Sequence, residues 1–370
     1  MSGYRVLVLG GYGFFGSRLV ERLARQGGLH IFAAGRSGDK ARASVEGLAC
    51  APATLVEGIE LDAMSGDFAS SLAHLQPAAV VHCCGPFQGQ DYRVAQACIA
   101  QGAHYIDLAD ARAFVAGISA LHAAAEGARV LVTSGASSVP ALSSAVVDAL
   151  TRGMQSVDSI DIGISPGNRT ERGLSTVRAI LGYCGKRLET PSGNSAWGWG
   201  TSYRHAYGHP VGRRFLSPCD VPDLALLPGR YAGAPSVRFG AGLELPFLHL
   251  GMNAMALMAR WGIVRDWSAH AALLKRIADG FRHAGSDAGA MHVEVRGRSP
   301  EGDRTTRRWE LLATHGDGPY VPTLAAAALV RQLATGHPPP IGAMRCMGLL
   351  SLDDFVREAN GLHIHMTDAA

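Results

Sequence analysis

The chain has 370 residues, more than one hydrophobic core usually organises, so we expect two connected domains. A hydrophobic content of 47%, a charged content of 18% and 46 glycines indicate a compact, loop-rich globular protein rather than a disordered or fibrous one. The formal net charge of +3 is small and no basic run is interleaved with aromatic residues. The sequence therefore argues against nucleic acid as a partner.

Cysteine usage and hydropathy indicate a reducing compartment. The seven cysteines contain no CxxC spacing, and no secretory signal stands before Tyr4, so we expect a soluble, cytoplasmic protein. The most membrane-like stretch, Leu245–Ala259, has no formal charge, but His249 and Asn253 interrupt it. It is also shorter than the ~18 residues of a candidate membrane span. We expect a buried or interfacial helix there and no integral membrane segment.

The first part of the chain alternates apolar, strand-like runs with amphipathic helical stretches, the pattern of a parallel sheet wrapped by helices. Leu19 and Leu23 recur at helical spacing before Gly27, which suits the end of a first helix. Six strands with helical crossovers are enough for a complete Rossmann domain, a doubly wound α/β fold. The strand candidates are Arg5–Leu9, His30–Ala34, Thr54–Glu57, Ala79–Cys83, His104–Leu108 and Arg129–Thr133.

A glycine-rich loop joins the first predicted strand to the first predicted helix, the context in which a glycine pattern indicates a dinucleotide site. The loop fits both a GxxGxxG and a GxGxxG spacing; we prefer the longer one, which begins at Gly10 directly after the strand. Glycines there permit a tight turn and bring the backbone close to a pyrophosphate. The alternative is that they serve only the turn. The predicted cofactor-binding residues of this loop are Gly10, Gly11, Gly13, Phe14, Phe15 and Gly16.

The second predicted strand ends at a cationic segment. An acidic residue at this point would hold the ribose hydroxyls of NAD. Arg36 instead offers a planar cation to a 2′-phosphate, with Ser37 as a hydroxyl donor and Lys40 close behind. We therefore predict NADP(H) as the cofactor, the alternative being an arginine that is merely solvated on a loop.

Two further loops are predicted to contact the cofactor. Asp62 follows the third strand, where it either reaches the adenine end or is solvated. Cys84, Gly85, Pro86 and Phe87 follow the fourth strand, at the carboxyl edge where open parallel sheets bind ligands. We expect their backbone to line the nicotinamide half. The adjacent cysteines are interpreted as packing residues, because no activating partner is visible.

The pattern changes after residue 150. Period-2 alternation over Val157–Ile164 and two runs that flank a turn, Met291–Arg298 and Thr305–Ala313, indicate antiparallel strands. Phe247–Trp261 and Ser268–His283 have helical patterns. This region is predicted to be α+β, with one sheet face left in need of cover, so we expect a homodimer.

The domain boundaries follow from this change. We predict a Rossmann domain over 1–150 plus 320–370, with an inserted α+β domain containing an antiparallel sheet over 151–319. The alanine-rich stretch Pro322–Thr335 is expected to return as a helix that packs closely on the Rossmann sheet.

Four segments of the first domain resemble the saccharopine dehydrogenase-like family: Val80–Phe87 (VVHCCGPF), Val94–Cys98 (VAQAC), Gly102–Leu108 (GAHYIDL) and Ser134–Ser143 (SGASSVPALS). Gly316–Leu324 and the stretch from Gly342-Ala343 to Leu352–Phe355 are also similar to family members. The phosphate loop is longer than the usual one, and the middle of the chain has no transferable pattern. The resemblance implies a nicotinamide oxidoreductase that acts on a C–N bond, an imine or secondary amine, of a small amino-acid-like substrate.

Asp107 is the catalytic candidate that this resemblance transfers. It closes the fifth strand, where a carboxylate can steady a cationic iminium near the hydride donor. The alternative is that Asp107 caps the following helix. We expect Cys84–Phe87, Asp107 and Ser134–Ser137 to converge on one cleft.

The sequence lacks the motifs of two other functional classes. The YxxxK pair of short-chain reductases is absent, and the histidines have no zinc-site spacing, so no metal is predicted. Two alternatives stay open: an NADPH-dependent C=C or C=O reductase of a lipid-like substrate, for which Met252, Met255 and Met258 would line the pocket, and a non-enzymatic NADP-binding regulator.

Overall fold

The computed structural model describes residues 3–189 and 195–367. The chain folds into two compact units: the first comprises Met1–Leu142 and Pro319–Glu358, the second Ser143–Gly318 and Ala359–Ala370. Residues 143–150 and 359–367 lie in the second unit and Pro319 lies in the first, whereas the sequence predicts the reverse assignment for each. The division of function between domains stays a prediction.

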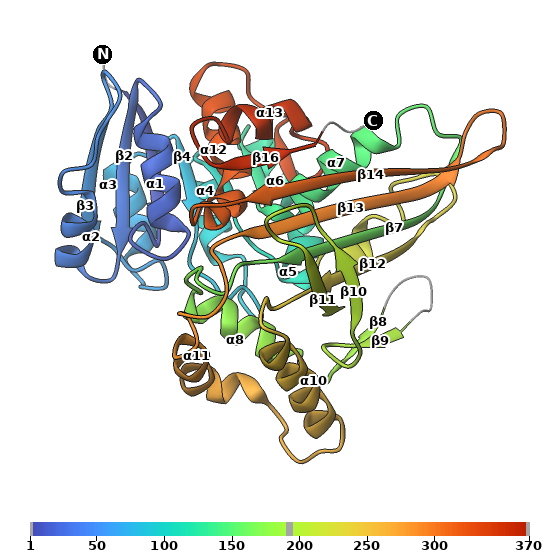
Figure 1. Cartoon of the computed structure of the whole chain (residues 1–370). Coiled ribbons are helices and arrows are strands. Elements are labelled where there is room, and N and C mark those ends of the chain that lie inside the picture. Colours follow the sequence, from blue (N-terminus) through green and yellow to red (C-terminus); the bar gives the residue numbers. More distant parts are fainter. Residues whose placement is uncertain (1–2, 190–194, 368–370) are drawn as a thin grey trace. The chain divides into compact units, whose positions relative to one another are not determined.

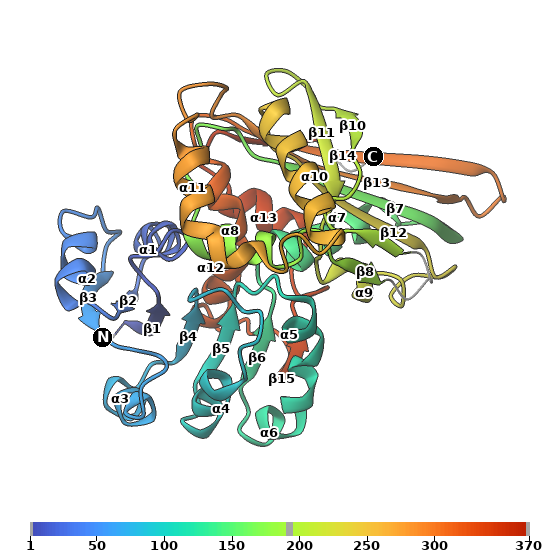
Figure 2. The ribbon, with the colours of Figure 1, turned by 90° about the horizontal axis from the view of Figure 1, so that it is seen from below.

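The first unit is built on a parallel sheet of seven strands in the order β15-β6-β5-β4-β1-β2-β3. This confirms the predicted Rossmann sheet, with strand order reversing between β1 and β4. Figure 2 shows β4, β5 and β6 next to one another. The strands are β1 Tyr4–Leu9, β2 Leu29–Gly35, β3 Leu55–Glu60, β4 Ala79–His82, β5 His104–Asp107, β6 Leu131–Ser134 and β15 Gly342–Arg345.

Residue patterns explain these elements. Val6, Leu7 and Val8 are all fully buried, because a central parallel strand has both faces covered. In the first helix, Leu19 and Leu23 face the core, as the spacing predicts. The helices of the unit are α1 Gly16–Ala24, α2 Gly38–Val45, α3 Phe68–Leu75, α4 Arg93–Ala100, α5 Arg112–Gly117, α6 His122–Gly127, α12 Val321–Ala334 and α13 Leu352–Glu358, with short turns at Ile118–Leu121, Ser138–Leu142 and Gly318–Tyr320.

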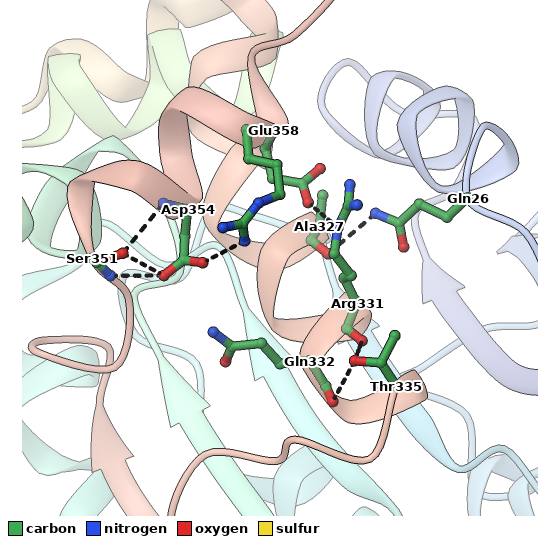
Figure 3. Close-up of polar contacts among 9 residues, drawn as sticks. Gln26, Ala327, Arg331, Gln332, Thr335, Ser351, Asp354 and Glu358 are labelled. Atoms are coloured by element: carbon green, nitrogen blue, oxygen red, sulfur yellow. Dashed lines mark hydrogen bonds and ion pairs between the residues drawn. The ribbon is translucent and has the colours of Figure 1, made fainter.

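The C-terminal helices α12 and α13 are tied to the first unit by buried contacts (Figure 3). Helix α12 packs on α1, and Gln26 donates a hydrogen bond of 3.4 Å to the carbonyl of Ala327. The Glu358 carboxylate is 1% exposed and lies 2.6 Å from Arg331 Nε. The buried Arg22 guanidinium donates to the backbone carbonyl of Glu358. Burial lowers the pKa of Arg22 and the charge of Glu358 opposes this, so the carboxylate stabilises cations of both α1 and α12.

The second unit contains a seven-stranded sheet in the order β10-β11-β12-β7-β13-β14-β16. It is mixed rather than purely antiparallel, because β12 pairs with β7 in parallel; β7, β13 and β14 run side by side in Figure 1. A two-stranded sheet pairs β8 with β9. The strands are β7 Ser156–Ser165, β8 Arg187–Glu189, β9 Ser195–Trp197, β10 Tyr203–Ala206, β11 Arg213–Pro218, β12 Ser236–Ala241, β13 Gly289–Arg298, β14 Arg304–Ala313 and β16 Ile364–Met366.

Helices accompany this sheet, and α7 packs on β13 and β14. The predicted helix over 268–283 is a short 3₁₀ turn followed by a shorter α-helix. No helix within residues 3–189 and 195–367 has the length and hydropathy needed to span a bilayer. The helices of the unit are α7 Ser143–Leu150, α8 Leu174–Gly182, α9 Asp223–Leu226, α10 Pro246–Arg260, η3 Trp267–His270 and α11 Ala271–Asp279.

The two faces of the large sheet differ in character. Ile160, Val293 and Trp309 are buried, whereas the strand register places Arg238, Asp161, Glu294 and Arg308 in one charged row across four strands. Arg238 and Arg308 are bonded to the acids of that row and remain largely exposed. The homodimer is predicted from a sheet face that needs cover. This face is charged and can stay in contact with water, so the sheet gives no reason to expect a dimer.

Candidate cofactor-binding site

The loop between β1 and α1 is shaped by its glycines. Gly10 has φ +77°, a conformation that side chains rarely adopt, and its carbonyl accepts from the amide of Gly13 at 2.8 Å. A Cβ on Gly11 would lie 2.7 Å from Ala33 Cα, and one on Gly16 would lie 2.0 Å from the Gly10 carbonyl oxygen. These positions tolerate no side chain, so the backbone at the start of α1 stays open to a pyrophosphate.

Phe14 and Phe15 close the loop on its helix side. Their rings are 4.8 Å apart, and Phe15 precedes the first residue of α1. The Arg18 guanidinium stacks 4.2 Å from the centre of the Phe14 ring and donates to the Phe14 carbonyl. Arg18 therefore places a cation near this loop. No spacing rule predicts this role from the sequence.

Tyr12 connects the glycine loop to the segment after β2. Its ring covers Gly35, where a Cβ would lie 2.2 Å from the ring, and its hydroxyl accepts from the Ser37 amide at 3.2 Å. The sequence analysis does not assign Tyr12 a role. An aromatic residue inside a glycine motif signals this contact only when the partner strand is known.

The cationic segment after β2 is accessible. Arg36 and Lys40 are exposed, and the Ser37 hydroxyl caps α2 by accepting from the Lys40 amide at 3.4 Å. Glu60, at the end of β3, accepts from the Gly38 amide at 3.1 Å. This carboxylate partly offsets the positive potential that Arg36 and Lys40 would offer to a 2′-phosphate.

Asp62 and Arg36 both lie within electrostatic reach of Cys84. Burial raises the pKa of Cys84 to about 11, with Asp62 raising it further and Arg36 lowering it. The Asp62 carboxylate is exposed and accepts from the Met64 amide at 3.0 Å. The raised pKa keeps the Cys84 thiol protonated, which supports the packing interpretation of this cysteine.

The loop of Cys84, Gly85, Pro86 and Phe87 is held from one side. Gln90 Nε2 donates to the carbonyls of Cys84 at 2.9 Å and of Pro86 at 2.8 Å. The Phe87 ring is buried against His82 and Phe114, with ring centres 5.1 and 5.3 Å away. The side chain of Phe87 thus anchors the loop, which leaves the backbone to face a ligand.

Asp107 is fully buried at the end of β5. Its Oδ1 accepts three hydrogen bonds of 2.9 Å, from the amides of Ala109 and Gly135 and from the Ser134 hydroxyl. Burial raises the pKa of Asp107 to about 6, although these hydrogen bonds act in the opposite direction. The carboxylate therefore joins the loop after β5 to the loop after β6.

The loops after β4, β5 and β6 lie at one edge of the sheet, because their strands are adjacent and parallel. Gln88 Nε2 lies 3.5 Å from Asp110 Oδ1, which links the first two loops, and Asp107 links the last two. No group of three potential metal ligands occurs in the part of the chain that the structure describes.

A glycine cradle at the β1–α1 turn, followed by a cationic segment after β2, defines an NAD(P)-binding Rossmann protein of the dehydrogenase class. Residues 6–133 match the family model described as saccharopine dehydrogenase NADP binding domain. This match confirms the family resemblance seen in the sequence of the first domain. No curated protein matches the chain.

Solved structures share the fold. Saccharopine dehydrogenase (L-Glu forming) from Saccharomyces cerevisiae matches with a TM-score of 0.67 at 13% identity, over 100% of both chains. At that identity the likeness concerns the fold alone. An amine dehydrogenase from Mycobacterium smegmatis matches with a TM-score of 0.47 at 10% identity, covering 92% of this chain and 94% of the other; a likeness that weak carries no argument.

Proposed function

We propose that the protein is an NADP(H)-dependent oxidoreductase that transfers a hydride to or from a C–N bond of an amino-acid-like substrate. The observation that carries the cofactor assignment is Arg36, an exposed cation beside the glycine cradle where NAD-binding domains have a carboxylate. The family of residues 6–133 and the fold shared with yeast saccharopine dehydrogenase support the reaction class.

The residues of the first unit fit this cofactor. When bound, NADP(H) supplies or accepts the hydride. The bare glycine backbone at Gly10–Gly16 would hold the pyrophosphate, and Arg36 with Ser37 would bind the 2′-phosphate. Tyr12 keeps these two loops together, and Gln90 orients the backbone after β4. The substrate side of the site rests on Asp107 and the loop that it holds.

The cofactor proposal is tested by calorimetry with NADP(H) and NAD(H). We expect NADP(H) to bind at least several-fold more tightly, and Arg36→Asp to erase or reverse that preference. Glu60→Gln should strengthen it, because a carboxylate next to the site is removed. Arg25→Asp, an exposed arginine on α1, is the matched control and should leave the ratio unchanged. Equal affinities in the parent protein would refute the NADP preference.

Asp107 is our catalytic candidate in two roles that can be separated. As an electrostatic partner of an iminium it would lower the barrier, so its loss would slow turnover by about 10²-fold while NADPH binding changes little. As a positioning residue it would only hold the Ser134–Ala136 loop, through the two hydrogen bonds that Oδ1 accepts from Ser134 and Gly135. Its full burial favours at least the second role.

Asp107→Asn distinguishes these roles when thermal stability and turnover are measured on the same preparation. The electrostatic role needs the ionised carboxylate, so turnover of the parent should rise through about pH 6, the pKa of Asp107, and the variant should lack that rise. A variant with a lower melting temperature but normal turnover of the folded fraction, at all pH values, would restrict Asp107 to holding the loop.

Two other functions remain as alternatives: a C=C or C=O reductase of a lipid-like substrate, and an NADP-binding regulator without catalysis. A screen of imine, ketone and enoyl substrates for NADPH consumption separates them, because only the regulator would consume none. The homodimer and the cytoplasmic location stay predictions. Light scattering at micromolar concentration tests the former, and cell fractionation the latter.

A further inference from the structure

Helix α10 of the second unit has its polar side chains inside. The His249 ring is fully buried, with Nε2 2.9 Å from Ser217 Oγ. Asn253 Nδ2 donates to the Trp199 carbonyl at 2.6 Å and to Ser217 Oγ at 3.0 Å. These two residues are the polar interruptions of an otherwise apolar stretch, and both are used to attach the helix to its own unit. Ala256 is also buried, whereas the large apolar side chains Phe247, Leu250 and Leu257 are exposed.

Two exposed apolar stripes result. Exposed apolar side chains recur at helical spacing along α10 and at the residue that follows it. They are Phe247, Leu250, Leu257 and Trp261, and Trp261 is 67% exposed. Helix α11 and the following turn repeat this pattern with three exposed side chains. We call the whole set the apolar helical face: Phe247, Leu250, Leu257, Trp261, Ile263, Leu273, Ile277 and Phe281.

The two stripes meet at one end, where the rings of Phe247 and Phe281 are 5.0 Å apart. Helices α10 and α11 lie on the same side of the second unit in Figures 1 and 2, with α8 packed against α11 and η3. Trp267 Nε1 donates to the Met255 carbonyl at 2.8 Å, which fixes the connecting segment on α10. Water-facing helices normally carry polar residues, and contiguous exposed apolar surface marks an interaction site.

The surface is also basic. The segment 246–283 contains five arginines and lysines against two aspartates. Both acids are engaged locally, since Asp266 caps η3 and Asp279 pairs with Lys275. Within the described residues, no ion pair to a carboxylate involves the remaining four cations, which are Arg260, Arg265, Arg276 and Arg282.

We propose that the apolar helical face docks on an anionic lipid bilayer. Apolar side chains next to unpaired arginines match the interface of such a membrane, where aromatic rings enter the headgroup layer and basic side chains reach lipid phosphates. Arg260 over the Trp197 ring, 4.6 Å from its centre, is one such pair at the edge of the face. A second copy of the chain is a poorer occupant, because a symmetric contact would bring like charges together.

The proposal does not depend on the reaction catalysed and is tested on the full chain by vesicle flotation. Phosphatidylcholine vesicles with and without phosphatidylserine are the probes. We expect binding to the mixed vesicles, at least about 10-fold weaker binding to pure phosphatidylcholine, and weakening by salt. Ile263→Glu, at a position 62% exposed, should reduce binding about 10-fold or more without changing the melting temperature. Val356→Glu, at a position on α13 that is 51% exposed, is the matched control and should bind like the parent.

The basic residues are tested separately. Arg265→Glu combined with Arg276→Glu should weaken binding to the mixed vesicles by at least the ~5-fold expected for each basic residue lost, whereas Arg304→Glu on the distant β14 should not. Three results would overturn the proposal: no binding to mixed vesicles, equal binding to both vesicles, or a dimer in light scattering that Ile263→Glu dissociates. The last would identify a second copy as the occupant.

Discussion

Helices α1 and α10 turn different kinds of side chain toward the interior of their units. In α1 the apolar residues Leu19 and Leu23 face the core, as helical periodicity requires of a surface helix. In α10 the buried side carries His249 and the hydrogen-bonded Asn253, and the exposed side carries Phe247 and Leu257. The difference shows that apolar periodicity identifies the inner face only where the interior is apolar. Beneath α10, His249 and Asn253 find hydrogen-bond partners at Ser217 and the Trp199 carbonyl, which belong to distant segments.

The first prediction concerns how far the first unit depends on its returning segment. Glu358→Ala removes the buried carboxylate that faces Arg331 and the buried Arg22. We expect a loss of about 3 kcal/mol in the free energy of unfolding of this unit, because the buried Arg22 guanidinium loses its counter-charge. Urea unfolding of the parent and variant measures it. Arg25→Ala, which breaks an exposed pair on α1, should cost less than ~0.5 kcal/mol. Equal losses of stability in the two variants would mean that the buried Glu358 carboxylate contributes no more than an exposed ion pair.

The second prediction tests the glycine cradle. Gly16→Ala places a Cβ 2.0 Å from the Gly10 carbonyl oxygen, so the loop must shift. We expect about 2 kcal/mol of destabilisation and markedly weaker NADP(H) binding, measured by denaturation and calorimetry. Gly127→Ala is the matched control, since a Cβ there meets no atom within 4 Å. If Gly16→Ala binds NADP(H) normally, the cradle is not the pyrophosphate site.

The third prediction bears directly on the contrast between the two helices. Asn253→Ala leaves the Trp199 carbonyl and Ser217 without their donor, and we expect a cost of roughly 1–2 kcal/mol. Leu257→Ser, on the exposed side of α10, should change stability by less than ~0.5 kcal/mol. Thermal melts of the two variants measure these losses of stability. A larger loss for Leu257→Ser than for Asn253→Ala would show that α10 is buried through its apolar side.

The smallest expected effect is a pH dependence in the second unit. Burial raises the pKa of Asp223 to about 7, although its bond from Ser143 opposes this. A raised pKa means that the folded state holds the proton more tightly, so this contribution to stability is complete below about pH 4 and is lost as pH rises through 7. The melting temperature of the parent should therefore fall between about pH 5 and about pH 8, and Asp223→Asn should reduce that fall. Asp303→Asn, in an exposed turn, should retain it; identical curves for both variants would contradict the assignment.

Much of the first unit was predictable because its signals are local. Each of the six predicted strands appears within a few residues of its expected bounds, and the glycine loop lies where the β1–α1 junction requires. The seventh strand, β15, was missed because Gly342–Arg345 is short and lies far along the chain from its partner β6. Tyr12, Arg18 and Gln90 were also missed, since their roles consist of contacts with other loops.

The second unit was predictable only in part. Period-2 alternation identified β7, β13 and β14, but alternation does not reveal which strands become neighbours, so the parallel β12–β7 pair was not foreseen. The stretch Leu245–Ala259 was recognised as an uncharged helix with two polar interruptions. Its orientation depends on partners from the turn at Trp199 and from β11, which hydropathy cannot indicate.

The sequence by itself determined which segments become strands and helices, the dinucleotide-type glycine loop and the cation placed after β2, because these depend on residues close together in the chain. Tertiary structure decided the burial of Asp107, the neutralisation of Arg22 by Glu358 and the outward turn of the apolar side of α10. Each of these depends on groups from distant segments. The physical reason is that burial and hydrogen bonding are settled by whichever groups the fold brings together. His249 and Asn253 can face the interior at little cost only because distant segments supply their hydrogen-bond partners.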